Sequence, residues 1–183
     1  MKQADLVALI RDGVPAKGGR WADLGAGEGA FTLALAELLG PDGHIIAVDR
    51  DAGALKRLAS EVDGRQSSAS AETLVADFTR PLLLTGLDGV VMANSLHFVR
   101  DKMPVLASVR TMLRPGGSLI VVEYGADRGN PWVPHPFSYP TWEGLAAAAG
   151  FEGTRLLATL PSRFLGSMYS SVATKPLAKA SAT

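Results

Sequence analysis

The residues best suited to chemistry in this sequence are glycines and polar residues that directly follow short apolar segments. The most specific group is a glycine-rich turn, with Gly25, Gly27 and Gly29 at alternate positions, which begins two residues after Asp23. Glycines let the backbone pass close to a ligand, and the N–H groups that open the next helix then face that ligand. Asp49 follows a second apolar segment, 20 residues beyond Gly29, where a carboxylate can accept hydrogen bonds from both hydroxyls of a ribose. This spacing predicts a site for a nucleotide-type ligand.

Polar residues also follow three later apolar segments. Asp77 precedes Phe78, Asn94 begins the run Asn-Ser-Leu-His, and Glu123 precedes Tyr124. In an open sheet with helices between its strands, ligands bind beyond the carboxyl ends of the strands. If the apolar segments are strands, these polar residues lie along one edge of the sheet together with the glycine-rich turn.

The segments between these residues alternate between short apolar runs, typical of strands, and longer runs with helical periodicity. We expect strands at 20–24, 44–48, 72–76, 87–93, 118–122, 151–159 and 167–174, and helices at 30–39, 52–62, 103–113 and 141–149. Strands that alternate with helices pair in parallel through right-handed crossovers. The last two strands are joined by a short loop only, so they must pair antiparallel as an edge hairpin. We further expect an N-terminal helix within 1–14 and a loose tail at 175–183.

The composition limits the classes of function. A chain of 183 residues corresponds to about one domain, and 47% hydrophobic with 20% charged residues is typical of a globular protein. Lys and Arg together number 18, as do Asp and Glu, which makes a nucleic acid partner unlikely. The lack of cysteine excludes a thiolate zinc site and a cysteine nucleophile. We assign no metal-binding residue. No apolar run reaches the roughly 18 residues of a membrane span, and we expect a cytoplasmic protein.

Taken together, these segments resemble the class I S-adenosylmethionine-dependent methyltransferases. Residues 21–29 (WADLGAGEG) are similar to the first motif of that family, and residues 46–49 (IAVD) to the second, whose acid binds the ribose. Residues 75–78 (VADF) resemble the third motif, in which the Asp meets the adenine amino group and the next residue packs on the ring. The LRPGG turn at 113–117 is similar to the turn before the fifth strand of the family. The resemblance covers residues 21–122.

This resemblance implies a Rossmann-like three-layer α/β sandwich. Its mostly parallel seven-stranded sheet has the order 3-2-1-4-5-7-6, with an antiparallel edge hairpin, and residues 1–183 form a single domain. It implies S-adenosylmethionine as the cofactor, with the methionine moiety near Asp23, Gly25 and Asn94. The cofactor-binding residues that it implies are Asp23, Gly25, Ala26, Gly27, Gly29, Asp49, Arg50, Asp77, Phe78 and Asn94.

Two alternatives remain open at this point. The glycine-rich turn also fits the G-x-G-x-x-A pattern of dinucleotide-binding oxidoreductases. Asp23 weighs against that alternative, because it would place a negative charge beside a diphosphate, and the chain leaves little length for a separate substrate domain. The second alternative is a domain that binds a cofactor or a partner without catalysing a reaction.

Methyl transfer from a sulfonium is an in-line displacement, which gains most from orientation of the reacting atoms. A hydroxyl acceptor would also gain from a general base, and His97 is the candidate at the correct edge. The alternative role of His97 is structural, at the start of the next helix. Asn94 is not followed by two prolines and an aromatic residue, which disfavours amino-methylation of nucleic acids.

The segment at 124–142 is rich in proline and aromatic residues and follows the fifth strand. Prolines stiffen a loop and aromatic rings can line a pocket. We therefore expect a small-molecule acceptor to contact this segment, unless the segment is only a rigid connector. The predicted substrate-binding residues are Tyr124, Trp132, His135 and Tyr139.

Overall fold

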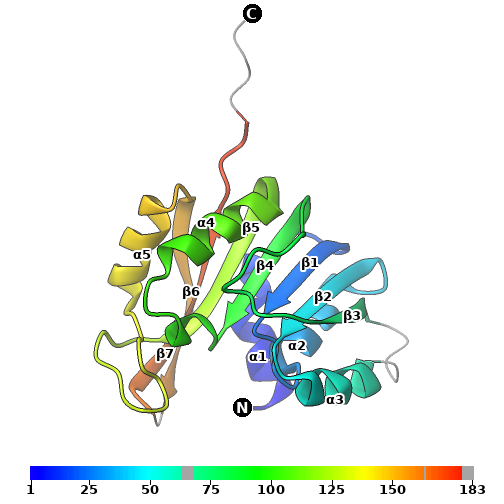
Figure 1. Ribbon diagram of the computed structural model, residues 1–183, viewed down its shortest axis with the longest axis horizontal. Helices are drawn as coiled ribbons and strands as arrows, with labels where there is room; N and C mark the ends of the chain where they lie inside the picture. Colours follow the sequence, from blue (N-terminus) through cyan, green and yellow to red (C-terminus); the bar gives the residue numbers. More distant parts are fainter. Residues whose placement is uncertain (63–67, 163, 179–183) are drawn as a thin grey trace, which may run out of the picture.

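The computed structural model describes residues 1–62, 68–162 and 164–178, which form a seven-stranded sheet with helices on both faces (Figure 1). The strands are β1 Gly19–Leu24, β2 Gly43–Asp49, β3 Ser70–Val75, β4 Leu87–Ala93, β5 Leu113–Tyr124, β6 Glu152–Ser162 and β7 Gly166–Thr174. The helices are α1 Gln3–Ile10, α2 Ala30–Leu39, α3 Ala52–Val62, α4 Met103–Met112 and α5 Tyr139–Ala148, with short 3-10 turns η1 Arg11–Gly13 and η2 Leu96–Phe98.

The sheet has the predicted order β3-β2-β1-β4-β5-β7-β6. Strands β1 to β5 pair in parallel, whereas β7 pairs antiparallel with both β5 and β6. Because β6 therefore runs in the same direction as β5, the β6–β7 turn lies at the edge where β1 to β5 have their carboxyl ends. The predicted fold class is confirmed, and one edge of the sheet collects the loops that can bind ligands.

Two apolar layers hold the helices against the sheet. Alternate residues of a strand face opposite sides, so Ala22 and Leu24 pack with α4 and α5, while Trp21 packs with α1 and α2. Helix α3 packs on the face shared with α2, through Leu55 and Leu58. Burial on both faces explains why the central strands are almost continuously apolar.

The largest departure from the expected elements is at the start of β5. This strand begins at Leu113 rather than at Ser118, and the LRPGG segment is part of it. Leu113 pairs with Leu87, and the register then shifts before Ser118 pairs with Gly89. A bulge of this kind absorbs the turn-like residues without ending the strand.

The two ends of the chain also differ in detail from the expectation. The predicted N-terminal helix is present as α1 followed by η1. The predicted tail begins tied to the sheet, because the Lys175 N–H donates to the carbonyl of Gly117 at 2.9 Å and Nζ donates to that of Leu113 at 2.6 Å. Residues 179–183 lie outside the described residues. Among the described helices, none combines the length and the hydropathy needed to cross a membrane.

Candidate functional site

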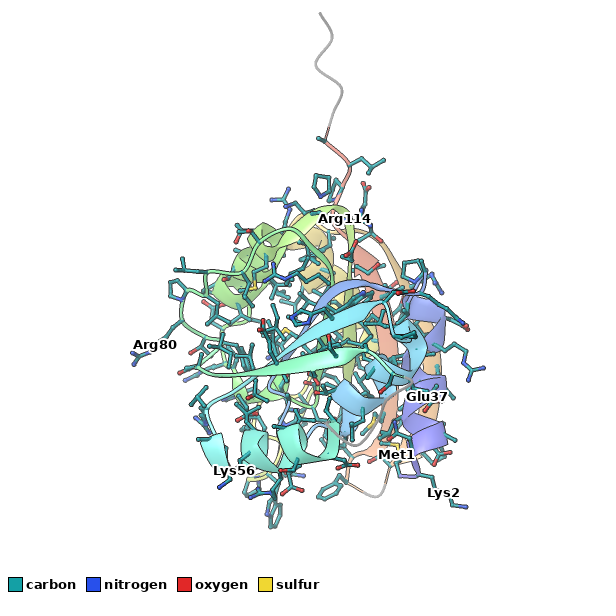
Figure 2. All side chains as sticks on the ribbon, turned by 90° about the vertical axis from the view of Figure 1, so that its right-hand side faces the viewer. Met1, Lys2, Glu37, Lys56, Arg80 and Arg114 are labelled. Carbon is teal, nitrogen blue, oxygen red and sulfur yellow. The ribbon has the colours of Figure 1, made fainter. Side chains whose placement is uncertain are left out.

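Two neighbouring cavities lie at the carboxyl edge of the sheet. The larger, of about 310 Å³, lies beyond β1 to β4, and the smaller, of about 270 Å³, lies between the glycine-rich turn and α1. Both are lined by Gly25 and Asn94, so the two cavities meet there. Met1, which is labelled in the lower part of Figure 2, lies at this carboxyl edge and lines the smaller cavity. Of the predicted cofactor-binding residues, the larger cavity is lined by Gly25, Asp49, Arg50, Asp77, Phe78 and Asn94, and the smaller by Asp23, Gly25, Ala26 and Asn94.

The predicted glycines have different structural roles. Gly25 has φ +85°, and a Cβ there would collide with the side chain of Ser95 and come within 3.3 Å of the Phe78 ring. Gly29 has φ +87°, and a Cβ there would collide with Leu58 of α3. Gly27 donates its N–H to Asp49 Oδ2 at 2.8 Å. Gly25 therefore leaves the larger cavity open, whereas Gly27 and Gly29 position the turn from outside the two cavities.

The acids at the ends of β2 and β3 are held by nearby N–H groups. Asp49 Oδ1 accepts the N–H of Asp51 at 2.9 Å, opposite the contact of Oδ2 with the turn. Asp77 Oδ1 accepts both the N–H and the hydroxyl of Thr79, and these hydrogen bonds lower the pKa of Asp77. No described residue donates to Asp77 Oδ2. Asp49 is thus held through both oxygens and Asp77 through one, and each carboxylate oxygen has lone pairs left to accept from a ligand.

Asp23 is buried and lies in the wall of the smaller cavity. Thr32 Oγ1 donates to Asp23 Oδ2 at 2.6 Å. Burial raises the pKa of Asp23 to about 6, and the negative charge of Asp49 adds to the shift. A cation bound in this cavity would favour the ionised form of Asp23, because opposite charges stabilise each other most where water is excluded.

Asn94 combines an unusual backbone conformation with a buried side-chain oxygen. Its φ is +52°, the only positive φ among the described non-glycine residues, and such conformations cluster at functional sites. Its Oδ1 is fully buried without a hydrogen-bond partner among the described residues. A buried acceptor without a partner is costly, so a donor on a ligand at the junction of the cavities would satisfy it. The larger cavity offers carboxylate oxygens that can accept hydrogen bonds from a nucleoside. The smaller cavity offers the Asp23 carboxylate and the Asn94 amide oxygen. Together these groups fit S-adenosylmethionine.

His97 forms a buried pair with Glu123 beside the cavities. The Nδ1 of His97 lies 2.8 Å from Glu123 Oε2, and Glu123 Oε1 accepts the N–H groups of Leu96 and His97 at 3.0 and 3.1 Å. In this contact Nδ1 serves as the donor nitrogen of the imidazole and Glu123 as its acceptor, which leaves Nε2 as the other ring nitrogen. Nε2 has no hydrogen-bond partner in the described part of the chain, and the His97 side chain is only 3% exposed. His97 itself lines neither cavity.

The structure divides the predicted acceptor-binding residues into two groups. The Tyr124 ring lies 5.7 Å from that of His97, and the His135 N–H donates to the His97 carbonyl at 3.0 Å. Trp132 is 71% exposed and lines neither cavity. Tyr139 packs against Tyr169 at the start of α5, with ring centroids 5.8 Å apart. Only Tyr124 and His135 are thus brought next to His97.

Two residues that the sequence analysis did not assign hold this region together. Glu123 positions His97, and the sequence signal for it is a carboxylate that directly follows the apolar run at 119–122. Lys102 Nζ donates to the carbonyls of Val99 at 2.9 Å and His135 at 3.0 Å and lies 4.8 Å from the centroid of the Phe137 ring. Burial lowers the pKa of Lys102. This lysine connects the segment that carries His97 to the loop that follows β5.

Comparison with known proteins agrees with this geometry. A family model described as "Methyltransferase domain" matches residues 22–119. The ubiquinone/menaquinone biosynthesis C-methyltransferase UbiE of Pseudomonas aeruginosa is 29% identical over 114 residues, which are 62% of this chain and 44% of that protein. The UbiE protein of Pseudomonas syringae pv. tomato is 32% identical over 108 residues, 58% of this chain and 42% of the relative. The match thus spans less than half the length of these curated relatives.

Solved structures show the same fold at low sequence identity. The YcgJ protein of Bacillus subtilis superposes with a TM-score of 0.76 at 12% identity, covering 96% of this chain and 100% of that one. An S-adenosylmethionine-dependent methyltransferase of Methanosarcina mazei superposes with a TM-score of 0.72 at 17% identity, covering 92% and 97% of the two chains.

Proposed function

This chain belongs to the class I S-adenosylmethionine-dependent methyltransferases, and from that premise we propose that it transfers the cofactor's methyl group to a small-molecule acceptor. The observation that carries the proposal is the meeting of the two cavities at Gly25 and Asn94. One cavity has the groups that bind a nucleoside, and the other has those that bind an amino acid with a positive charge. The methyl-bearing sulfur of the cofactor belongs between them.

In the proposed binding mode, the adenosine occupies the larger cavity. Asp49 accepts the ribose hydroxyls, Asp77 accepts the adenine amino group through Oδ2, and Phe78 packs on the base. In the smaller cavity Asn94 Oδ1 accepts a donor from the methionine moiety, while Asp23 provides negative charge near the cationic end. Charge-assisted hydrogen bonds of this kind are among the strongest that a protein makes.

We propose that His97 is the general base. The cofactor, when bound, would supply an electrophilic methyl group, and in-line attack on that group would release the sulfur as the thioether S-adenosylhomocysteine. His97 Nε2 takes the proton of the acceptor as the new bond forms, while Glu123 keeps the other imidazole proton on Nδ1 and fixes the ring. The alternative role of His97, a structural one, predicts no change in turnover when another side chain replaces the imidazole and the protein still folds.

The names of the relatives support a small-molecule acceptor. The two UbiE proteins are named for carbon methylation in ubiquinone and menaquinone biosynthesis. By likeness to them we propose a small organic acceptor for this chain. Family membership disfavours the oxidoreductase alternative. We also propose that residues 1–183 act as a single domain and that the protein is cytoplasmic, which cell fractionation tests.

The first test is cofactor binding measured by thermal unfolding. A ligand at 100 times its Kd stabilises the folded state by about 2.7 kcal/mol, so S-adenosylmethionine and S-adenosylhomocysteine should raise the Tm by several degrees. Asp49→Ala removes the ribose acceptor and should abolish most of that rise. Asp42→Ala, an exposed acid at the opposite edge of the sheet, is the matched control and should behave as wild type.

An equal rise in the Asp49→Ala variant would contradict the ribose assignment. The second measurement is acceptor-dependent formation of S-adenosylhomocysteine in a screen of candidate metabolites. Product formation supports catalysis. Cofactor binding with no product from any acceptor favours the alternative of a binding domain without catalysis.

A further inference from the structure

We infer that Gln3, at the start of α1, binds the carboxylate of the cofactor's methionine moiety. The inference rests on the proposed function and deepens it, because the proposed binding mode provides partners for the nucleoside and for the cationic end but none for the carboxylate. Gln3 lies outside residues 22–119, which the family model matches. The assignment therefore depends on this chain's own N-terminal helix.

Gln3 is a polar residue on the apolar face of α1. Leu6 and Val7, three and four positions later, are buried in the layer between α1, α2 and the sheet. Residues at this spacing share one face of a helix, and helical side chains tilt toward the N-terminal end of their helix. Because that end of α1 lies at the carboxyl edge, the Gln3 side chain tilts toward the edge that carries the cavities.

The amide group of Gln3 has a buried donor that nothing in the protein satisfies. Its Nε2 is fully buried and has no hydrogen-bond partner among the described residues. The other side-chain atoms of this kind in the described part of the chain are Asn94 Oδ1 and Ser170 Oγ. A buried donor without a partner is costly, and a leucine would fill the same place without that cost. An acceptor on a bound ligand would satisfy Nε2.

The segments that carry Gln3 and Asn94 both border the smaller cavity. Met1 and Leu6, on either side of Gln3 in the sequence, line this cavity, and Asn94 lines it from the end of β4. Gln3 itself is not in the cavity wall, so its amide reaches a ligand there by a change of side-chain rotamer. A glutamine has several rotatable side-chain bonds, and such a change does not require α1 to move.

The chemistry of the smaller cavity calls for a donor. Among the residues that line it, Asp23 has the only charged side chain, and none is Lys, Arg or His. The oxygens of Asp23 and Asn94 suit the ammonium group of the methionine moiety, but as acceptors they cannot bind its carboxylate. Ala30, which begins α2, also lines the cavity, so N–H groups at the start of that helix can share the carboxylate. Gln3 Nε2 is the side-chain donor that completes this set.

The experiment compares two ligands that differ only in the carboxylate, S-adenosylhomocysteine and decarboxylated S-adenosylhomocysteine. Their Kd values for wild type and Gln3→Leu are measured by calorimetry on the full chain. A hydrogen bond to a charged group corresponds to roughly tenfold to 100-fold in Kd, so Gln3→Leu should weaken S-adenosylhomocysteine binding by that factor. The Kd of the decarboxylated ligand should change less than about twofold, because that ligand has no group for Gln3 to bind.

The matched control is Lys2→Leu, the same replacement at the neighbouring residue. Lys2 is exposed, and its side chain extends away from the protein in Figure 2. The control removes a positive charge beside Gln3 and should bind both ligands as wild type does. Loss of S-adenosylhomocysteine affinity in Lys2→Leu but not in Gln3→Leu would overturn the inference and assign the carboxylate to Lys2.

A second measurement uses wild type alone and does not depend on how a variant folds. The sequence contains two Gln and two Asn, Gln3, Gln66, Asn94 and Asn130, so its side-chain amide NMR spectrum has only four NH2 pairs. S-adenosylhomocysteine should shift the Gln3 pair, whereas the decarboxylated ligand should leave it near its ligand-free position. An unshifted Gln3 pair in the S-adenosylhomocysteine complex would contradict the inference, as would equal weakening of both ligands by Gln3→Leu.

The proposed function is judged separately, by whether wild type binds S-adenosylhomocysteine at all. Binding that is indifferent to Gln3 retains the proposed function and removes the carboxylate assignment. A wild type that binds neither ligand contradicts the proposed function itself.

Discussion

The two halves of the candidate site are built differently. On the cofactor side, the fixing contacts are mostly short in sequence, such as Asp51 N–H to Asp49 and Thr79 to Asp77, each two positions apart. On the acceptor side they join distant segments: His97 and Glu123 are 26 positions apart, and Lys102 and His135 are 33 apart. Several contacts of the cofactor side thus form within local turns, although Gly27 and Asp49 are 22 positions apart. The contacts of His97 with Glu123 and of Lys102 with His135 form only in the folded sheet.

The cofactor side and the acceptor side also differ in the chemical groups that they present. Three acids and an amide surround the cofactor cavities, and backbone N–H groups hold two of the acids, Asp49 and Asp77. Aromatic rings and one His–Glu pair form the acceptor side. Changes to one half should therefore alter one kind of measurement and spare the other, and this separation can be tested directly.

The largest effect is expected on the acceptor side, from His97→Gln. General base catalysis contributes roughly 100-fold to 10,000-fold, so kcat with a hydroxylated acceptor should fall by at least that lower figure. The Kd for S-adenosylhomocysteine should change less than about twofold, since His97 lines neither cofactor cavity. His44→Gln, on the exposed part of β2, is the control. Unchanged kcat in a folded His97→Gln protein would assign His97 a structural role.

The second effect is the reverse, with loss of cofactor binding and retention of fold. Gly25 has a positive φ, and the Cβ that Gly25→Ala adds there would collide with the side chain of Ser95. Strain of 1–3 kcal/mol with the added collision should raise the Kd for S-adenosylhomocysteine by roughly 100-fold. Gly144→Ala, in α5 with no atom within 4 Å of the added Cβ, should bind normally. Calorimetry of S-adenosylhomocysteine binding to both variants tests whether the space beside Gly25 must stay free of a side chain.

The third and smallest effect is a change of stability with pH, from Asp23→Asn. The folded state keeps a proton on Asp23 up to pH about 6, whereas the unfolded chain loses it near 3.8. Stability of the wild type therefore falls as pH rises through this window, and the penalty is complete above it. From pH 4 to pH 8 the variant should gain about 2 kcal/mol of stability relative to wild type. Urea unfolding at both pH values measures this difference.

The same variant also sharpens the comparison between the two halves. Asn can still accept the hydroxyl of Thr32, but it supplies no negative charge to the smaller cavity. Cofactor binding should weaken while the apo protein gains stability. A variant that gained stability without losing affinity would show that Asp23 is only a buried turn residue.

The difference between the halves also explains what the sequence could predict. The fold and cofactor side follow from local patterns: apolar strands, the glycine-rich turn, and acids such as Asp49 and Asp77 at strand ends. The extended start of β5 was missed because its register shift depends on pairing with Leu87. The Glu123 partner of His97 was missed because their contact depends on how β4 and β5 align.

The hairpin between β6 and β7 has a consequence for how such a protein can diversify. The turn between Ser162 and Gly166 lies at the ligand-binding edge, and its described residues include none of those proposed to hold the cofactor. Surface turns tolerate insertions and replacements far better than packed elements do. New acceptor preferences can therefore arise through altered turn length or composition at this one place, while the nucleoside-binding machinery is inherited unchanged.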